Sequence, residues 1–114
     1  MNRARGVLPI EAAVHRITGE LASRYGLRDR GVVRTGAHAD LVVFDADRIA
    51  PTEGRWRDDL PGGCGRMYSE AVGIEWVIVN GVVVVRNGQL TGAQPGQVLR
   101  SGVDTDTVPV TARQ

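Results

Sequence analysis

Apolar residues along the chain fall into three segments, and each segment predicts a different element. From residue 9 onward, apolar positions recur at spacings of three and four residues, which gathers them on one helical stripe: Ile10, Ala13, Val14, Ile17 and Leu21. Residues 40–45 and 74–86 are instead rich in β-branched side chains, which is typical of strands. The predicted order is helix, strand, long loop and hairpin.

Sequence signals at both ends limit the helix. Pro9 suits the first turn because its fixed φ fits a helix and its missing N–H would have no intrahelical partner there. Gly19 is expected to break or bend the helix after Thr18. Gly26 is well placed as the left-handed residue beyond the helix end, so the helical region should stop near Tyr25.

The strand and the hairpin are predicted from different features. Asn80-Gly81 joins two β-rich runs, and both residues tolerate the positive φ angles that a two-residue type I′ turn requires. In residues 40–45 the apolar positions are continuous instead of alternating, which is typical of a strand covered on both faces. The valines of the hairpin are equally unbroken, so its faces should also need cover.

The segment from residue 46 to residue 72 shows no period, and glycine, proline and charged residues recur in it, so it is predicted to be a long loop. Loops of this length are uncommon inside a compact domain. We therefore expect the segment to pack on a surface that this chain does not itself supply. Pro95-Gly96 should begin a polar tail that is frayed through residues 97–114.

Length and composition indicate one small globular domain. The 114 residues are 42% apolar, 24% charged and 4% aromatic, which suffices for a core of valine, leucine, isoleucine and alanine. All fourteen basic residues are arginine, but thirteen carboxylates reduce the formal net charge to +1, and the arginines are scattered. Proteins that bind nucleic acids concentrate basic charge on one face, so no nucleic-acid partner is expected.

Neither secretion nor membrane insertion is indicated. The single cysteine, Cys64, cannot form an internal disulfide, and no Asn-X-Ser/Thr glycosylation site is present. No apolar run approaches the length that crosses a bilayer, and no continuous apolar stretch precedes Glu11. A cytoplasmic location without a membrane partner is the expectation.

The two histidines are weak candidates for metal binding or catalysis. His15 lies one helical turn after Glu11, which predicts an ordinary surface pair, and it lacks a second histidine at metal-binding spacing. His38 precedes the predicted strand, where Asp40 and Asp45 could join it, but His-x-Asp alone is a weak motif. Structural or solvated roles are favoured for both histidines.

Cys64 and the glycines before it are a second weak candidate. Cys64 should be accessible between glycines, and Arg66 could favour its reactive thiolate, but no base is near it in the sequence. The amides of Gly62-Gly63 could cradle an anion, but no phosphate-binding fingerprint follows a strand. A flexible turn is the favoured interpretation.

The remaining polar residues do not complete an active site. Ser23, Ser69 and Ser101 lack the context of a nucleophile elbow. The adjacent carboxylates Asp58-Asp59 would point to opposite sides of any extended segment. The sequence therefore predicts no catalytic, cofactor-binding or metal-binding residue in this chain.

Several motifs together nevertheless resemble the C-terminal end of the amidohydrolase superfamily. They are Leu8-Pro9-Ile10-Glu11-Ala12-Ala13-Val14 with Thr18, Tyr25-Gly26-Leu27, Asp29-Arg30-Gly31, and the run from Gly36 through His38 and Asp40 to Asp45. Three further motifs resemble the N-acyl-D-amino-acid deacylase (D-aminoacylase) branch: Gly73-Ile74-Glu75, Val79-Asn80-Gly81 and Thr91-Gly92-Ala93-x-Pro95-Gly96. The resemblance covers about residues 5 to 100. A hydantoinase or dihydroorotase relative is the alternative branch and differs in substrate.

The resemblance implies an α+β fragment. Residues 1–27 would form the last helical layer of a (β/α)8 barrel, and residues 28–96 would form strands of a small composite β-sandwich, with the loop 46–72 against the barrel and residues 97–114 as a flexible tail. Family members are metal-dependent hydrolases, usually with zinc, that release a carboxylate and a D-amino acid. Their metal ligands belong to barrel motifs absent here, so no ligand is carried over to this chain.

Two hypotheses follow from these observations. In the first, the chain is the C-terminal portion of such a hydrolase, inactive alone, and its partner is the missing catalytic barrel. In the second, it is a stand-alone interaction or oligomerisation module without enzymatic activity. That module would self-associate through the hairpin edges, because an unpaired strand edge is a template for further pairing.

Overall fold

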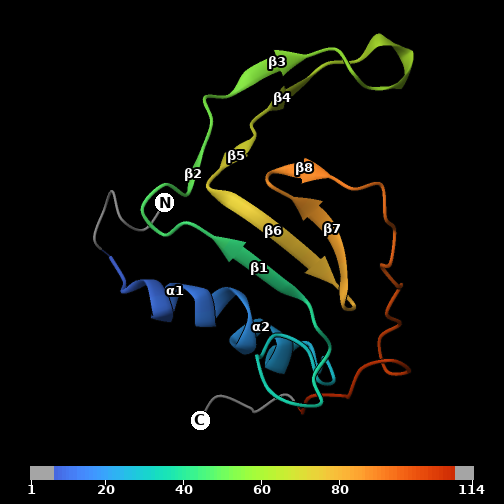
Figure 1. Ribbon diagram of the computed structural model, residues 1–114. Helices are drawn as coiled ribbons and strands as arrows, with labels where there is room; N and C mark the ends of the chain where they lie inside the picture. The colour runs from blue at the N-terminus through green and yellow to red at the C-terminus, as the bar shows by residue number, and fades with distance from the viewer. Residues whose placement is uncertain (1–6, 110–114) are drawn as a thin grey trace.

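The structure, a computed structural model, describes residues 7–109, which form a small α+β fold (Figure 1). Two helices, α1 (Ile10–Ile17) and α2 (Gly19–Arg24), precede an antiparallel sheet of order β1-β6-β7-β8. The strands of this main sheet are β1 (Leu41–Phe44), β6 (Ile74–Val79), β7 (Val82–Arg86) and β8 (Gln89–Leu90). The other strands are β2 (Ala50–Pro51), β3 (Arg55–Arg57), β4 (Arg66–Tyr68) and β5 (Ala71–Val72), with a 3-10 turn η1 (Pro61–Gly63).

The helical segment is interrupted where the sequence predicts. Thr18 leaves the helical region with φ −122° and ψ −88°, and its hydroxyl donates a hydrogen bond to the Val14 carbonyl at 2.7 Å. The predicted break before Gly19 is therefore confirmed. No helix within residues 7–109 is long and apolar enough to span a membrane.

The end of α2 is a Schellman motif. Gly26 has φ +64°, its amide donates to the Ser23 carbonyl at 3.2 Å, and the Leu27 amide donates to the Ala22 carbonyl at 2.8 Å. These two bonds satisfy carbonyl groups that the helix leaves without a partner at its end. The prediction of a helix that stops near Tyr25 is confirmed.

The central hairpin is also confirmed. Asn80 and Gly81 have φ angles of +48° and +78°, as a type I′ turn requires, and Val79 pairs with Val82 across it. A second pair with positive φ, Asn87-Gly88, turns the chain into β8. Turn chemistry that is readable in the sequence thus determines most of the main sheet.

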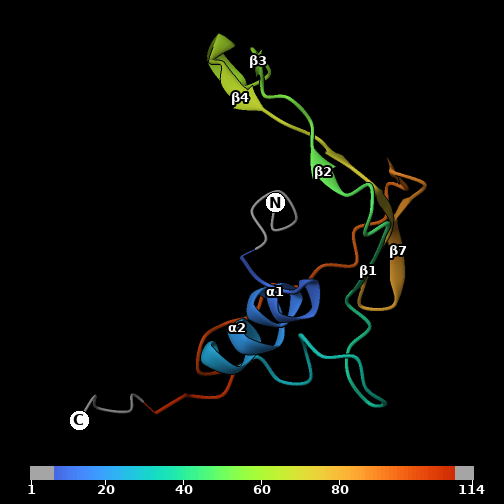
Figure 2. The same ribbon diagram turned by 90° about the vertical axis from the view of Figure 1, so that its left-hand side faces the viewer.

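Both faces of the main sheet are apolar, and neither is fully covered. The pairs across β1, β6 and β7 are Leu41–Ile78, Val43–Trp76, Val42–Val77 and Val77–Val85. Val42 and Val43 remain 52% and 51% exposed, so the prediction that residues 40–45 are covered on both faces is wrong for this chain by itself. The reason is that the helices lie beyond β1 and leave most of the sheet open (Figures 1 and 2).

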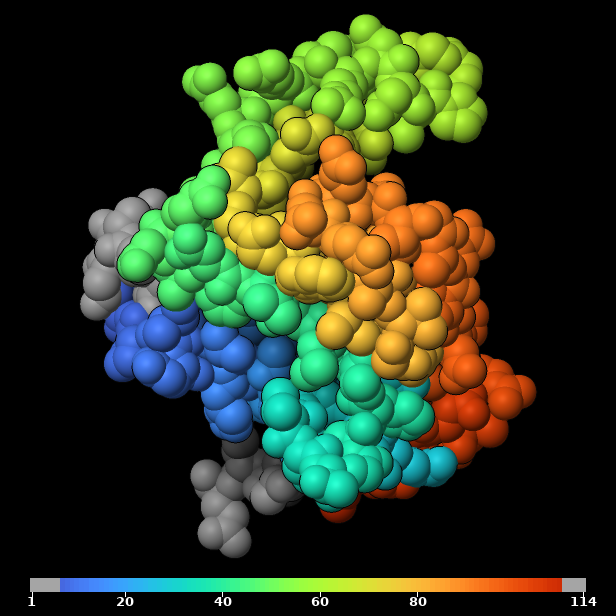
Figure 3. Space-filling view, in the orientation of Figure 1, coloured from blue at the N-terminus to red at the C-terminus, as the bar shows by residue number. Residues whose placement is uncertain are grey.

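Residues 50–72 form a protruding β-ribbon, whereas the sequence predicts a long loop over residues 46–72. β2 pairs with β5 and β3 pairs with β4, and the ribbon extends away from the main sheet (Figures 1 and 3). Strands of two or three residues are too short to show the alternation by which strands are recognised in a sequence. The ribbon is the largest local departure from the prediction.

Residues 97–109, which we call the strap, return to the helices instead of forming the predicted frayed tail. Thr105 is 7% exposed and forms an isolated bridge with Leu27, and the Asp106 amide donates to the Gly26 carbonyl at 2.8 Å. The prediction of a flexible tail is therefore wrong for this segment. Residues 110–114 of the predicted tail lie outside the described residues.

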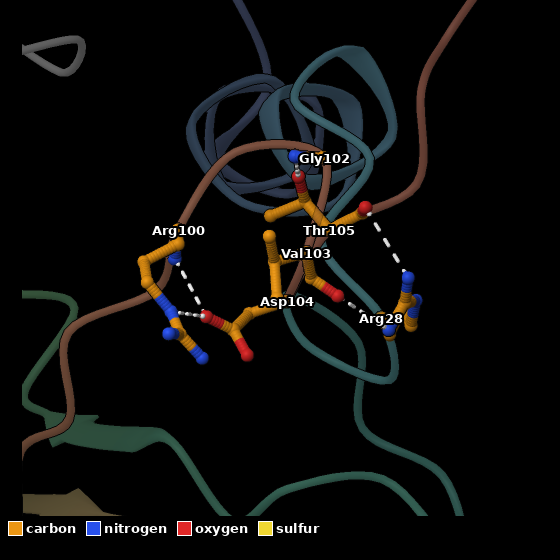
Figure 4. Close-up of polar contacts among 6 residues, drawn as sticks. All are labelled: Arg28, Arg100, Gly102, Val103, Asp104 and Thr105. Carbon is orange, nitrogen blue, oxygen red and sulfur yellow. Dashed lines mark hydrogen bonds and ion pairs between the residues drawn. The ribbon is translucent and has the colours of Figure 1, made fainter.

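Arg28 fastens the strap with three hydrogen bonds. Its Nε donates to Asp106 Oδ1 at 2.7 Å. Its terminal nitrogens donate to the carbonyl groups of Val103 and Thr105, each at 3.3 Å, as Figure 4 shows. Within the strap, Arg100 pairs with Asp104 at 2.9 Å. The three bonds of Arg28 join residues more than seventy positions apart, which explains why no local pattern predicts them.

Candidate functional site

Residues from separate motifs of the sequence meet in one polar network. The Arg30 guanidinium donates to the Asp40 carboxylate and, at 2.9 Å, to the side-chain oxygen of Asn80. The other Asp40 oxygen accepts a hydrogen bond from the backbone N–H of Asn80 at 2.8 Å. The side-chain nitrogen of Asn80 donates to the Pro95 carbonyl, also at 2.8 Å. The network ties the segment before β1 to the β6–β7 turn and to the segment after β8.

The electrostatics of this network suit a structural role. The side chains of Arg30 and Asp40 are 13% and 31% exposed. Burial raises the pKa of Asp40, but hydrogen bonds from the Asn80 amide and from Arg30 outweigh it, so this pKa lies below its ordinary value of 3.8. A carboxylate engaged in this way is a poor proton acceptor.

Because its pKa is lowered in the folded protein, Asp40 should stabilise the fold at neutral pH and lose that contribution in acid. The stabilisation is complete above the pKa of the unfolded carboxyl and is lost as the pH falls through the lower folded value. We expect the free energies of unfolding of the wild type and Asp40→Asn, measured in urea, to differ at pH 7 and to converge well below pH 3.8. A difference that is independent of pH would contradict this assignment.

The structure does not assemble the candidate around His38. Asp40 precedes β1 and Asp45 follows it, so the two carboxylates lie roughly 16 Å apart along the strand. Asp45 instead accepts the backbone amides of residues 47 and 48, at 2.8 and 3.2 Å. His38 lies on the Asp40 side, where its charge contributes to the lowered pKa of Asp40.

The other histidine and the cysteine are far from each other in the fold. His15 lies on α1 and, with Glu11, lines an open groove beside the main sheet. Cys64 is exposed near the tip of the β-ribbon. Arg66 donates two hydrogen bonds to Asp59, at 2.8 and 2.9 Å, and this pairing holds the pKa of Asp59 below its usual range.

The remaining candidates from the sequence lie on three separate segments. Ser23 is in α2, Ser69 is in the β-ribbon, and Ser101 is in the strap. Asp58-Asp59 accept hydrogen bonds from other side chains of the ribbon. Gly62-Gly63 have φ angles of +76° and +70° and shape the turn at the ribbon tip. The structure brings none of these groups together as a nucleophile and a base.

The residues present do not fit a zinc site of the kind that the resemblance implies. A catalytic zinc ion takes three protein ligands from histidine, cysteine and carboxylate side chains. Over residues 7–109, no three such side chains lie together where they could hold a metal ion. No metal chemistry is therefore assigned to this chain's own residues.

Uncovered apolar surface is the main feature that remains. The accessible surface is 9386 Å², compared with roughly 6,100 Å² for a compact monomer of 12.2 kDa. The Cα radius of gyration is 17.1 Å, compared with about 13 Å for a compact chain of this length. In the described part of the chain, Ala22, 5% exposed, is the only buried apolar side chain. The described residues therefore leave most of their large apolar side chains partly or largely exposed.

An open apolar groove lies between α1 and β1 and encloses about 540 Å³. It is lined by Ile10, Glu11, Val14, His15, Phe44 and Ala46. Ile10 and Val14 belong to the helical stripe predicted from the sequence, and each is 37% exposed. At these two positions the stripe faces a groove that the described residues leave open.

Comparison with known proteins identifies the fold to which this surface belongs. Residues 2–85 match the Amidohydrolase family. The chain is a member of this family. The amidohydrolase chain is 39% identical over 110 residues to the N-acyl-D-aspartate deacylase of Alcaligenes xylosoxydans xylosoxydans and 38% identical over 97 residues to the D-aminoacylase of the same organism. These matches cover 96% and 85% of the chain.

A solved structure extends the match to three dimensions. The crystal structure of a D-aminoacylase that "defines a novel subset of amidohydrolases" superimposes with a TM-score of 0.61 at 37% identity. The alignment covers 81% of this amidohydrolase chain and 18% of the solved chain, in its C-terminal part. The chain spans about a fifth of the length of the curated relatives that it matches.

The family motifs can now be assigned to positions in the fold. Arg30, Asp40, Asn80 and Pro95, which the sequence offers as signs of family membership, form the polar network that holds three segments together. Asn80 therefore serves both the type I′ turn and the network, and sequence reasoning identified the turn alone. In this amidohydrolase chain the motif residues thus hold the segment before β1, the β6–β7 turn and the segment after β8 together by hydrogen bonds.

Proposed function

We propose that this chain is the C-terminal part of a hydrolase that converts N-acyl-D-amino acids to a carboxylate and a D-amino acid, and that it is inactive without a catalytic part. The observation that carries the proposal is the uncovered apolar surface of α1 and the main sheet in a chain that spans about a fifth of its relatives. Relatives named N-acyl-D-aspartate deacylase and D-aminoacylase support the substrate class.

In this proposal the two bodies have different tasks. The helices of residues 10–24 pack on the catalytic barrel as its last helical layer, and the main sheet completes a small β-sandwich. The catalytic part holds the zinc ion and supplies the residues that hydrolyse the amide. The groove between α1 and β1 fits this arrangement, because an apolar helix and an apolar sheet are stable when each packs on another layer.

Activity measurements on separated parts test the proposal. The full chain would be assayed with zinc and N-acetyl-D-aspartate, alone and after co-expression with the N-terminal four fifths of the Alcaligenes N-acyl-D-aspartate deacylase. We expect background hydrolysis from the chain alone and measurable release of D-aspartate from the co-expressed pair. Turnover that stays proportional to the concentration of the isolated chain through purification would contradict the proposal.

A second candidate is a stand-alone interaction module, and one observation favours it. β1 is an edge strand, and its four residues Leu41–Phe44 are all apolar, so its free edge can pair with another strand. Analytical ultracentrifugation with hydrogen exchange separates the two candidates. A defined oligomer with protected β1 amides supports the module, whereas a chain that is soluble only with the catalytic part supports the hydrolase.

A further inference from the structure

An exposed apolar pair occupies one face of the β-ribbon. Trp56 and Met67 lie directly opposite each other on β3 and β4, so their side chains share a face. They are 62% and 65% exposed. Large apolar side chains that remain this exposed and lie together are typical of sites for binding another protein. Tryptophan is also among the residues that contribute most to protein interfaces.

The two side chains have room to lie flat because glycines flank them. A Cβ atom built on Gly65 would lie 2.3 Å from the Trp56 ring, and one built on Gly54 would lie 3.2 Å from the Met67 methyl carbon. The Trp56 indole nitrogen also donates to Asp58 at 2.8 Å. The ring is therefore held in one orientation before any partner binds, which lowers the entropy lost on association.

The opposite face of the ribbon is already occupied by its own contacts. Arg57 and Arg66 lie over the Tyr68 ring, 4.1 and 5.1 Å from its centroid. Arg57 also pairs with Glu70 at 3.1 Å. Charged groups that are paired and stacked in this way are stable in water. The apolar Trp56–Met67 face is therefore the face of the ribbon that would gain more from burial against another protein.

The position of the ribbon indicates what covers this face. The ribbon projects beyond the main sheet (Figure 3) and leans to the same side of it as the helices (Figure 2). The catalytic part proposed above accounts for about four fifths of the relatives' length. A second copy fits less well, because a two-fold contact through Trp56 would place Asp58 near its own symmetry mate.

We propose that Trp56 and Met67 form a second docking point for the catalytic part, separate from the groove between α1 and β1. Their apolar side chains become buried when the chain and the catalytic part associate. The β-ribbon thus contacts the catalytic part at a distance from the main sheet. This inference rests on the proposed function, because it takes the catalytic part as the partner.

A pull-down experiment tests the inference. The tagged full chain is co-expressed with the N-terminal four fifths of the Alcaligenes N-acyl-D-aspartate deacylase, and the amount of this partner captured is measured. Trp56→Ala should reduce the partner captured at least ~10-fold, as expected for a central tryptophan of an interface. Met67→Glu should have a similar effect while leaving the indole in place. Arg55→Ala is the matched control, because Arg55 pairs with Tyr68 on the opposite face, and it should capture as the wild type does.

A second measurement reads Trp56 directly. With 5-fluorotryptophan in the full chain, the fluorine resonances of Trp56 and Trp76 are assigned by replacing each with phenylalanine, and the unlabelled partner adds no signal. The Trp56 resonance should shift on complex formation. This inference alone is overturned if the wild type captures the partner, the Trp56 resonance does not move, and both variants capture as much partner as the wild type does. No capture by the wild type overturns the proposed function as well, and self-association lost in Trp56→Ala assigns the face to a second copy.

Discussion

Replacing Gly26 by alanine should detach the strap from α2 and lower the free energy of unfolding by about 2 to 4 kcal/mol. Gly26 has φ +64°, and a Cβ atom at this position would lie 1.9 Å from the Asp106 carbonyl oxygen. The strap must then move away, which breaks the bond from the Asp106 amide to the Gly26 carbonyl. Urea unfolding measures the loss, and faster hydrogen exchange at the Asp106 amide locates it.

Gly36→Ala is the matched control for the Gly26 variant. Gly36 also has a positive φ, +88°, but a Cβ atom there would meet nothing within 4 Å. We expect it to cost about 1 kcal/mol, the penalty of the left-handed conformation itself, and to leave exchange in the strap unchanged. Equal losses in the two variants would show that the contact with the strap contributes nothing.

Replacing Arg30 by alanine should lower the free energy of unfolding by about 2 to 3 kcal/mol at pH 7, because hydrogen bonds to charged groups are lost and Asp40 is left without its cation. Arg30 donates to two acceptors at once, Asp40 and Asn80. Arg30→Lys should recover only part of the loss, since an ammonium group does not reproduce the planar fork of a guanidinium group. Urea unfolding followed by circular dichroism measures both variants.

The nearby pair of Arg34 with Asp29 provides the comparison for Arg30. Its side chains are 60% and 51% exposed, whereas Arg30 is 13% exposed. Arg34→Ala should therefore change the free energy of unfolding by at most about 1 kcal/mol, as is usual for surface ion pairs. If Arg34→Ala cost as much as Arg30→Ala, the polar network would have no special role.

Elements with local signals could be predicted from the sequence. Gly26 marks the helix end because no other residue adopts its φ as readily, and Asn80-Gly81 marks the hairpin for the same kind of reason. Both signals depend on a few consecutive residues. The structure confirms each of them with the angles that the turn chemistry requires.

Elements that depend on distant contacts could not be predicted from local patterns. The strap is polar in sequence, but Arg28 fixes it through bonds to residues 103–106. The β-ribbon is built of very short strands that pair residues about ten or more positions apart, such as Arg55 with Tyr68. In both cases the decisive partner is remote along the chain, so helical or strand periodicity does not report it.

The candidate site shows the same division. The motifs with Arg30, Asp40 and Asn80 were identified as signs of the family, but their mutual hydrogen bonds emerge only from the fold. The unbroken valines of the hairpin predict strands that need cover, and cover by a body outside this chain stays a prediction. The sequence does not predict the exposed Trp56–Met67 face, because the segment around it shows no period and is predicted to be a loop.

The type I′ turn at Asn80-Gly81 also has a consequence for the order of assembly. Hairpins with such local contacts form in about 1 to 10 μs, so β6 and β7 can pair as soon as both are available. β1 must wait for closure of the segment that separates it from β6, which slows its addition. We therefore expect a nascent sheet that grows outward from the turn, with β1 joining after β6 and β7 have paired.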